Sequence, residues 1–416
     1  MRCVGRVDPH DDVVGTADLL GRGNTGNFRD RCCRYGSLTD LGLDQYVSLN
    51  HGVPFVHDDD QPVADPNRLA HIVTDNGAEC PIKRAHMKTK GAVRTLSTDP
   101  VPTVSEVGEQ VLIDLFTTPD EDSRGDHVVL VGPGDDAAVL VGGGPVVVST
   151  DALVDGRHFR LDWSSPHQIG FKAVVANAAD VVSMGGRVTG FLASVTCPKD
   201  IPVTTLVGLR DGMREAARRY GANVVGGDLT AGDQLVLAVT AIGAMDTRKP
   251  VRLSAAQVGD VVAVSGPLGS SAAGMDLLSA GISDFAALVQ AHCAPEPHLE
   301  LGVAAAESGV HSMTDISDGL VRELHTMSRA SGLRIEIDVA AIPVVSELPA
   351  AAARLGVDMN VWTTAGGEDH ELLATFAPGD LPAGWTAIGS VHAGPADPPV
   401  TISGMDADPE AGWHTF

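Results

Sequence analysis

Short valine-rich runs that lead into Gly/Asp turns recur along most of this chain, and they limit the folds open to it. From residue 103 the runs are HVVLVGPGDDAAVL, PVVVSTDALVDG, VTGFLASVTCP, NVVGGDLT and QLVLAVTAIGAM. Segments with helical apolar spacing lie between them, the longest being PHQIGFKAVVANAADVVSM and VTTLVGLRDGMREAARRYG. Strands that alternate with helices and glycine turns predict an α/β fold.

A second series of the same kind follows a charged, proline-containing stretch, DTRKPVRLSAAQVGD. It contains VVAVSGPLGSSAAGMDLL, RIEIDV, WTTAGGEDHELLATF and WTAIGSV. We therefore predict two α/β domains, over residues 98–247 and 248–416. Aromatic residues make up only 4% of the chain, so the cores must be built mainly from Ala, Val, Leu and Ile. The alternation is too irregular to distinguish a barrel from a Rossmann sheet.

Residues 1–97 show neither helical nor strand periodicity over any sustained length. Such a segment cannot readily bury enough apolar surface to offset its ordering entropy. A disordered tail, a small accessory module and an upstream translation that the natural protein lacks are the three explanations, and we favour the first or the third. The regular pattern starts after it, where TVSEVGEQVLIDLF predicts a helix with Ser105 as its N-cap.

The formal net charge of −25 is concentrated in the larger part of the chain. Residues 1–97 hold 12 Lys and Arg against 13 Asp and Glu, which leaves 17 against 41 in residues 98–416. A nucleic-acid surface needs a basic stripe, so this balance argues against that partner. No run of about 18 apolar residues predicts a membrane span, and no apolar N-terminal core predicts a signal peptide. The six cysteines form no CxxC pair, and a reduced cytoplasm is the expected location.

Five acidic segments join carboxylates to Gly, Ser or an apolar helix. Mg²⁺ prefers oxygen ligands and usually takes one or two carboxylates together with water and substrate phosphates. Carboxylates can approach a triphosphate only with cations between them, so the set predicts multi-metal phosphate chemistry. The segments are Gly134-Asp135-Asp136, Ser149-Thr150-Asp151, Asp180, Gly226-Gly227-Asp228 and Asp315-Ile316-Ser317-Asp318-Gly319.

Each of these segments also has a structural interpretation, because an Asp in a glycine turn commonly caps backbone amides. Asp180 would be an ordinary solvated helix residue in that interpretation. Its neighbours in AVVANAADVVSM are almost all apolar, however, so we expect its carboxylate not to be freely solvated. Asn177, three residues earlier, would share its face. The presence of all five segments in one chain favours the metal site.

The usual nucleotide-binding motifs are absent: there is no GxxxxGK[ST] and no protein-kinase set. The turn at Ser265–Gly274 could cradle phosphate at a helix N-terminus, with a plain loop-to-helix turn as the alternative. Lys172 and Arg252 are the cations to consider for phosphate contacts, unless they are surface residues. No GxSxG or activated cysteine supplies a nucleophile, and phosphoryl transfer by positioning and charge neutralisation needs none.

Eight segments, in order, resemble thiamine-monophosphate kinases and cover residues 104–416. This resemblance implies a two-domain fold like that of aminoimidazole ribonucleotide synthetase, with the N-terminal extension outside it, and a homodimer that uses the first domain. It also implies direct in-line transfer of the ATP γ-phosphoryl group to thiamine monophosphate, giving thiamine diphosphate. The segments are VGPGDDAAVL, VVSTDALVDGRHF, KAVVANAADVVSMGG, VVGGDLT, SGPLGSSAAG, TDISDGL, AGGEDHELL and AGWHTF.

The resemblance also implies roles for single residues. Several Mg²⁺ ions would be bound by Asp136, Ser149, Thr150, Asp151, Asp180, Asp228, Asp315 and Asp318, with Asp151, Asp228 and Asp318 assisting the transfer. ATP would contact Gly227, Asp228, Arg252 and Ser317. Thiamine monophosphate would contact His158, Glu368 and Trp413.

Other functions of the same fold agree less well with the sequence. Hydrogenase maturation factors use a C-terminal cysteine, and this chain ends in Trp-His-Thr-Phe. Selenophosphate synthetase would show a reactive cysteine in a glycine-rich setting, which Cys80 lacks. Aminoimidazole ribonucleotide synthetase fits the DISDG and GGED combination less well. A protein that binds thiamine phosphates or metals without turnover is the alternative from a different class.

Overall fold

The computed structural model describes residues 102–107, 144–394 and 398–405, the segments 69–71, 95–97, 129–131 and 139–140, and residues 408 and 412. Strands β1 (Leu69–His71) and β2 (Thr95–Ser97) pair antiparallel. Apart from these, the prediction that residues 1–97 are disordered or not native lies outside the described residues. Among the described residues no helix is both long and apolar enough to cross a membrane.

A four-stranded sheet forms the first unit, in the order β5-β8-β6-β7. Only the β6–β7 pair is parallel, because helix α6 connects these two strands. The strands are β5 (Val146–Val154), β6 (Arg187–Cys197), β7 (Val224–Ala231) and β8 (Val236–Ala244), and the helices are α5 (Pro166–Ser183) and α6 (Val203–Arg219). A separate antiparallel pair consists of β3 (Val129–Val131) and β4 (Val139–Leu140).

Helix α5 confirms the prediction for residues 166–184. Ser165 caps it, with reciprocal hydrogen bonds to Gln168 in a capping box, and Pro166 occupies the first turn. The prediction of Ser105 as a helix cap is wrong, because α3 (Val104–Val107) already includes it. Thr103 precedes that helix, and its backbone N–H donates to Glu106 Oε2 at 2.8 Å.

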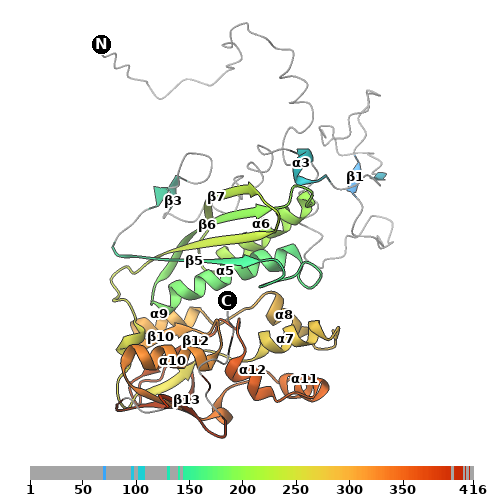
Figure 1. Cartoon of the computed structure of the whole chain (residues 1–416). Helices are drawn as coiled ribbons and strands as arrows, with labels where there is room; N and C mark the ends of the chain where they lie inside the picture. Colours follow the sequence, from blue (N-terminus) through green and yellow to red (C-terminus); the bar gives the residue numbers. More distant parts are fainter. Residues whose placement is uncertain are drawn as a thin grey trace, which may run out of the picture.

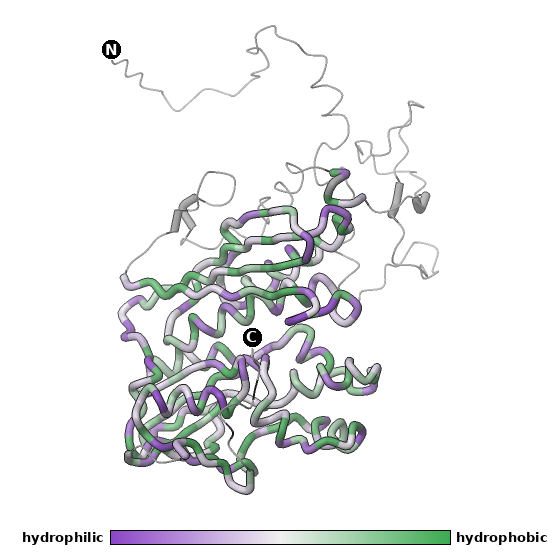
Figure 2. The backbone as a smooth tube through the Cα atoms, in the orientation of Figure 1, coloured by the Kyte–Doolittle hydropathy of each residue, from purple (hydrophilic) through white to green (hydrophobic). Residues whose placement is uncertain are grey.

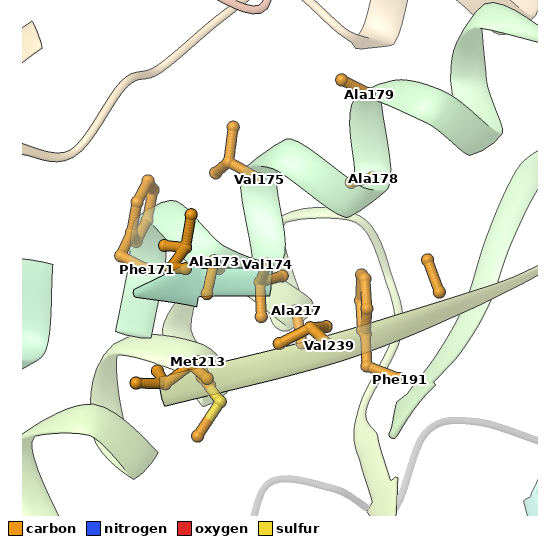
Figure 3. Packing of buried hydrophobic residues seen from close by; sticks show 14 of the residues in the cluster. Phe171, Ala173, Val174, Val175, Ala178, Ala179, Phe191, Met213, Ala217 and Val239 are labelled. Carbon is orange, nitrogen blue, oxygen red and sulfur yellow. The ribbon is translucent and has the colours of Figure 1, made fainter. Parts of the chain in front are cut away.

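Helices α5 and α6 cover one face of the first sheet, and their side chains form its core. Phe171 and Val174 of α5 pack with Met213 of α6 and with Phe191 and Val239 of the sheet (Figure 3). Figure 2 shows hydrophobic stretches along the strands of this sheet. The two helices approach closely at glycines: a Cβ at Gly212 would overlap the His167 carbonyl oxygen, and one at Gly170 would overlap that of Leu209.

The second unit is built on a six-stranded sheet in the order β10-β12-β9-β13-β11-β14. All its neighbours are antiparallel except β11 and β14. The strands are β9 (Val261–Val264), β10 (Ser312–Asp315), β11 (Arg334–Ile337), β12 (Leu372–Phe376), β13 (Thr386–His392) and β14 (Val400–Ile402). The helices are η3 (Leu253–Ala255), α7 (Ser270–Ser279), α8 (Ala286–Cys293), α9 (Glu300–Glu307), α10 (Leu320–Ser331), η4 (Val339–Ala341), α11 (Leu348–Leu355) and α12 (Met359–Ala365).

Helix α5 lies between the two units (Figure 1). It packs on β5, β6 and β8 on one side and on β10, α8 and α9 on the other. One continuous core therefore includes Val181 of α5, Met313 of β10 and Leu372 of β12. Since the described strands of each sheet fall on one side of residue 247, we propose the predicted boundary between residues 247 and 248 as the domain division.

Candidate active site

Strand β5 carries the Ser149-Thr150-Asp151 motif, and its pairing with β8 decides which way each side chain points. Ser149 lies opposite Ala241 and Asp151 opposite Val239, and both partners are fully buried beneath α5. Directly opposed residues of an antiparallel pair point to the same face. Ser149 and Asp151 therefore lie on the helix-covered face of the sheet, toward α5.

Helix α5 supplies the partners of these two residues. Ser149 Oγ donates a hydrogen bond of 2.6 Å to Asp180 Oδ2, and the Asp151 backbone N–H donates one of 2.9 Å to Asn177 Oδ1. Asn177 is buried and in turn donates to the Ala173 carbonyl, so its orientation is fixed. The prediction that Asp180 is not freely solvated is confirmed: burial, together with the nearby Asp315 charge, raises its pKa to about 6.

Thr150 and Asp228 lie on the other face of the sheet, the face that no described helix covers. Thr240 Oγ1 donates to Thr150 Oγ1 at 3.0 Å, and Thr240 is paired across the sheet with Leu192. Asp228, on edge strand β7, pairs with Ser194 on that same face, and Gly227 precedes it. Strands β8 and β6 separate β5 from β7, a span of roughly 14 Å at the usual strand spacing. The Thr150 and Asp228 side chains of one chain are thus not brought together.

The DISDG and GGED motifs of the second unit are hydrogen-bonded to each other. The Glu368 N–H donates to the Ser317 carbonyl at 2.7 Å, and the His370 N–H donates to the Ile316 carbonyl at 3.0 Å. His370 Nδ1 also lies 3.2 Å from Asp315 Oδ2. Burial disfavours the charged imidazole, but the hydrogen bond and the charge of Asp315 raise the pKa of His370 on balance.

The acidic residues of the two units interact across their junction. Asp315 of β10 and Asp151 of β5 both raise the pKa of Asp180, and burial followed by Asp315 and Asp151 raises that of Asp318 despite Arg322. Neighbouring carboxylates of like charge disfavour each other's ionisation unless a cation compensates. Within the described part of the chain, no three His, Cys, Asp or Glu side chains are already gathered to hold a metal ion by themselves.

Two of the three residues predicted to contact the acceptor substrate, His158 and Glu368, meet at Lys172. Its ammonium forms an ion pair with Glu368 Oε2 and donates to the His158 carbonyl at 3.2 Å. Burial disfavours the Glu368 carboxylate, but Lys172 lowers its pKa below the ordinary value. His158 Nδ1 accepts from the Val154 N–H at 3.1 Å, which fixes its ring. Lys172 is therefore not placed as a phosphate contact. Two assigned residues, Asp136 and Trp413, lie outside the described residues.

Comparison with known proteins shows the family of this chain. The model for "AIR synthase related protein, N-terminal domain" matches residues 134–245, and the model for the corresponding C-terminal domain matches residues 257–395. The thiamine-monophosphate kinase of Mycobacterium tuberculosis is 46% identical over 317 residues, which cover 76% of this chain and 93% of that protein. The chain belongs to the thiamine-monophosphate kinase family.

Other members of this kinase family support the same conclusion. The thiamine-monophosphate kinase of Corynebacterium glutamicum is 41% identical over 324 residues, 76% of this chain and 95% of that protein. A solved structure, "AaThiL complexed with AMPPCP and TMP", is 30% identical with a TM-score of 0.62, covering 77% of this chain and all of that one. The predicted two-domain fold of the aminoimidazole ribonucleotide synthetase type is confirmed.

Two acidic residues beside this kinase site were missed by the sequence reasoning. Burial, then the charges of Asp315 and Asp318, raises the pKa of Glu323 in the first turn of α10 to about 8. Asp369 is buried and accepts from the Gly269 and Ser271 backbone N–H groups at 2.6 and 2.9 Å. Of the two alternatives for Ser265–Gly274, this favours a plain loop-to-helix turn, because an internal carboxylate accepts hydrogen bonds from two of the backbone N–H groups at the start of α7.

Buried His292, at the end of α8, predicts a dependence of stability on pH in this kinase. Burial, followed by the Lys172 charge, lowers its pKa from 6.5 to about 4. Between pH 6.5 and about 4 the unfolded chain therefore binds a proton at His292 that the folded chain does not bind. The free energy of unfolding falls as the pH drops through this range. We expect this histidine to account for about 2 kcal/mol of the loss between pH 7.5 and 5.

Urea unfolding of wild type and His292→Gln at both pH values measures this contribution. The variant should lose about 2 kcal/mol less than wild type on acidification. Equal losses in wild type and His292→Gln would show that His292 is not the group responsible.

Proposed function

We propose that this chain transfers the γ-phosphoryl group of ATP to the phosphate of thiamine monophosphate, giving thiamine diphosphate and ADP. The observation that carries this proposal is the acidic set divided between the two units: Asp151 and Asp180 from the first, Asp315 and Asp318 from the second. Each unit alone holds half of it. Substrates that bear phosphates would therefore be held where the units meet.

The acidic set fits Mg²⁺. Besides burial, the charges of Asp315 and Asp151 raise the pKa of both Asp180 and Asp318, as expected of a site whose charge balance requires a cation. The lack of a preformed three-ligand cluster also fits, since Mg²⁺ usually takes only one or two carboxylates and completes its shell with water and phosphate oxygens. Bound ions would neutralise the phosphate charges that otherwise repel these residues. Ser149, Asp151, Asp180, Asp315 and Asp318 would hold them, with Asp136 as a further proposed ligand.

The remaining residues would orient the two substrates. Arg252 is exposed and immediately precedes η3, which packs against α10, the helix that follows the DISDG loop. A guanidinium there can bind phosphate oxygens in a bidentate fashion. We assign Arg252 and Ser317, with Gly227 and Asp228, to ATP, and His158, Glu368 and Trp413 to thiamine monophosphate. Positioning of this kind suits direct in-line transfer, because no covalent nucleophile is required.

The face of the first sheet that no described helix covers supports the proposed homodimer. It exposes Val146 and Val148 of β5 by 55% and 62% and Leu192 of β6 by 37%. An apolar row on a sheet face is a common interaction surface. A second copy packed on this face would bring the Thr150 and Asp228 side chains of both chains into one interface, where their proposed metal role would apply.

We expect Val148→Asp to convert the dimer to a monomer, because it places a charge at the centre of the apolar row. The molar mass measured by light scattering during size-exclusion chromatography should fall from two chains to one. Val357→Asp, at an exposed valine beyond α11, is the matched control and should leave the mass unchanged. An unchanged mass for Val148→Asp would remove this face from the proposal.

A comparison of acceptors tests the proposed substrate against the rival functions of this fold. We expect the purified chain to phosphorylate thiamine monophosphate but neither thiamine, selenide nor formylglycinamidine ribonucleotide. Turnover of one of the latter would assign a different reaction, and binding of thiamine monophosphate without turnover would favour a non-catalytic binding protein. We retain the predicted cytoplasmic location, with which the free thiols of Cys197 and Cys293 agree.

A further inference from the structure

Lys172 is a buried cation in the second turn of α5, with only 2% of its side chain exposed. An ammonium group has three hydrogens to donate, and in water all three would be solvated. Here the three acceptors are Glu368 Oε2, the His158 carbonyl at 3.2 Å and the His292 carbonyl at 3.1 Å. The charge is therefore fully satisfied by the protein, and its position is fixed by three separate segments.

Those three segments come from both units. His158 belongs to the loop after β5, His292 to the end of α8, and Glu368 to the loop between α12 and β12. Glu368 adopts a φ of 66°, a conformation that is costly for a residue other than glycine. Its Oε2 is buried against Lys172, whereas a quarter of its side chain remains exposed. The ion pair thus fixes one carboxylate oxygen of a side chain that is not fully enclosed.

We propose that Lys172 is a positioning residue for the acceptor substrate: it holds the His158 loop and the Glu368 carboxylate in the relative geometry that binds thiamine monophosphate. This inference rests on the proposed function, since both segments are assigned there to that substrate. Lys172 itself touches no reacting atom. The same helix carries Asp180 eight residues later, about 12 Å along its axis, so α5 links the acceptor contacts to the acidic set.

Two other contacts between the units lack this connection. Arg248, which also pairs with Glu307 of its own unit at 3.1 Å, donates to the Gly185 carbonyl at 3.0 Å, and Arg219 forms an ion pair with Glu296 at 2.7 Å. Neither of these two contacts involves the His158 loop or the Glu368 loop. Removing them tests the attachment of the units alone. Removing Lys172 tests attachment together with the geometry of the acceptor contacts.

Lys172→Met keeps an unbranched side chain of nearly the same length and removes the charge and the three hydrogen bonds. We expect the KM for thiamine monophosphate to rise on the order of tenfold or more, because small misplacements of binding groups cost this much. The KM for ATP should change by less than about twofold, since none of the residues proposed for ATP contacts Lys172. Arg248→Met, the matched control, should leave both KM values within about twofold of wild type.

Lys172→Arg keeps the charge, and it provides a second variant should the methionine variant fail to fold. A planar guanidinium cannot direct three bonds from one nitrogen, so it should still raise the KM for thiamine monophosphate more than that for ATP. Equal changes in both KM values, or none, in the variants that fold would overturn the positioning role while leaving the kinase function in place. A wild-type chain that forms no thiamine diphosphate would overturn the proposed function, and this inference with it.

Discussion

Asp151→Asn should reduce kcat at least about 100-fold while the fold remains intact, because it removes a charge from the centre of the acidic set. Asp151 lies on β5 beside Asp180, with its backbone N–H held by Asn177. An asparagine side chain can still accept the 2.8 Å hydrogen bond that Asp151 Oδ1 receives from the Ala152 N–H. The loss should therefore appear in Mg²⁺-dependent turnover, measured as ADP release, and not in the circular dichroism spectrum.

The matched control for this variant is Asp233→Asn, which removes an exposed carboxylate from the same unit. It should retain wild-type turnover and the same dependence on Mg²⁺ concentration. Full Mg²⁺-dependent turnover by Asp151→Asn would contradict the role assigned to this residue. Equal losses in both variants would point to net charge and not to position.

Gly212→Ala should destabilise the fold by at least about 3 kcal/mol, although alanine is the better helix former by about 1 kcal/mol. The added Cβ would overlap the His167 carbonyl oxygen, which is backbone and cannot rotate away. Helices α5 and α6 would have to separate, and α5 carries both Lys172 and Asp180. Equilibrium unfolding in urea, followed by circular dichroism, measures the change.

Gly208→Ala is the control for this prediction, one turn earlier on the same helix. Its Cβ would come within 2.8 Å of the Pro166 side chain and 3.3 Å of the His167 nitrogen, a milder conflict. We expect it to cost clearly less than Gly212→Ala. A Gly212→Ala protein as stable as wild type would show that the two helices are not locked at this glycine contact.

Much of the fold could be predicted because local pattern and tertiary structure agree. The valine-rich runs became β5, β6, β8 and β9, and the capped segment after Ser165 became α5. The sheet order could not be predicted, since it depends on pairings between residues far apart in the chain, such as Val264 with Leu373. The capping residue before α3 could not be predicted either, because one polar residue before an apolar run does not fix which residue begins the helix.

The acidic motifs of the site were visible in the sequence, but their partners were not. Lys172 gave no signal beyond being a charge within an apolar helix, and its three acceptors come from loops far apart along the chain. Asp369 lies within the GGED motif, but only the folded structure shows that its carboxylate accepts hydrogen bonds from the backbone N–H groups at the start of α7. The pairing register of β5 and β8 also places the Thr150 side chain on the opposite sheet face from those of Ser149 and Asp151. The sequence motif alone did not show this.

The central claim is that this chain moves a phosphoryl group from ATP to a phosphate acceptor with the help of Mg²⁺. Incubating the full chain with ATP, Mg²⁺ and thiamine monophosphate, and separating the products by chromatography, tests it most directly. We predict thiamine diphosphate and ADP in equal amounts, with both lost when the metal is chelated or thiamine monophosphate is left out. ADP without thiamine diphosphate, or no product at all from a folded chain, would contradict it.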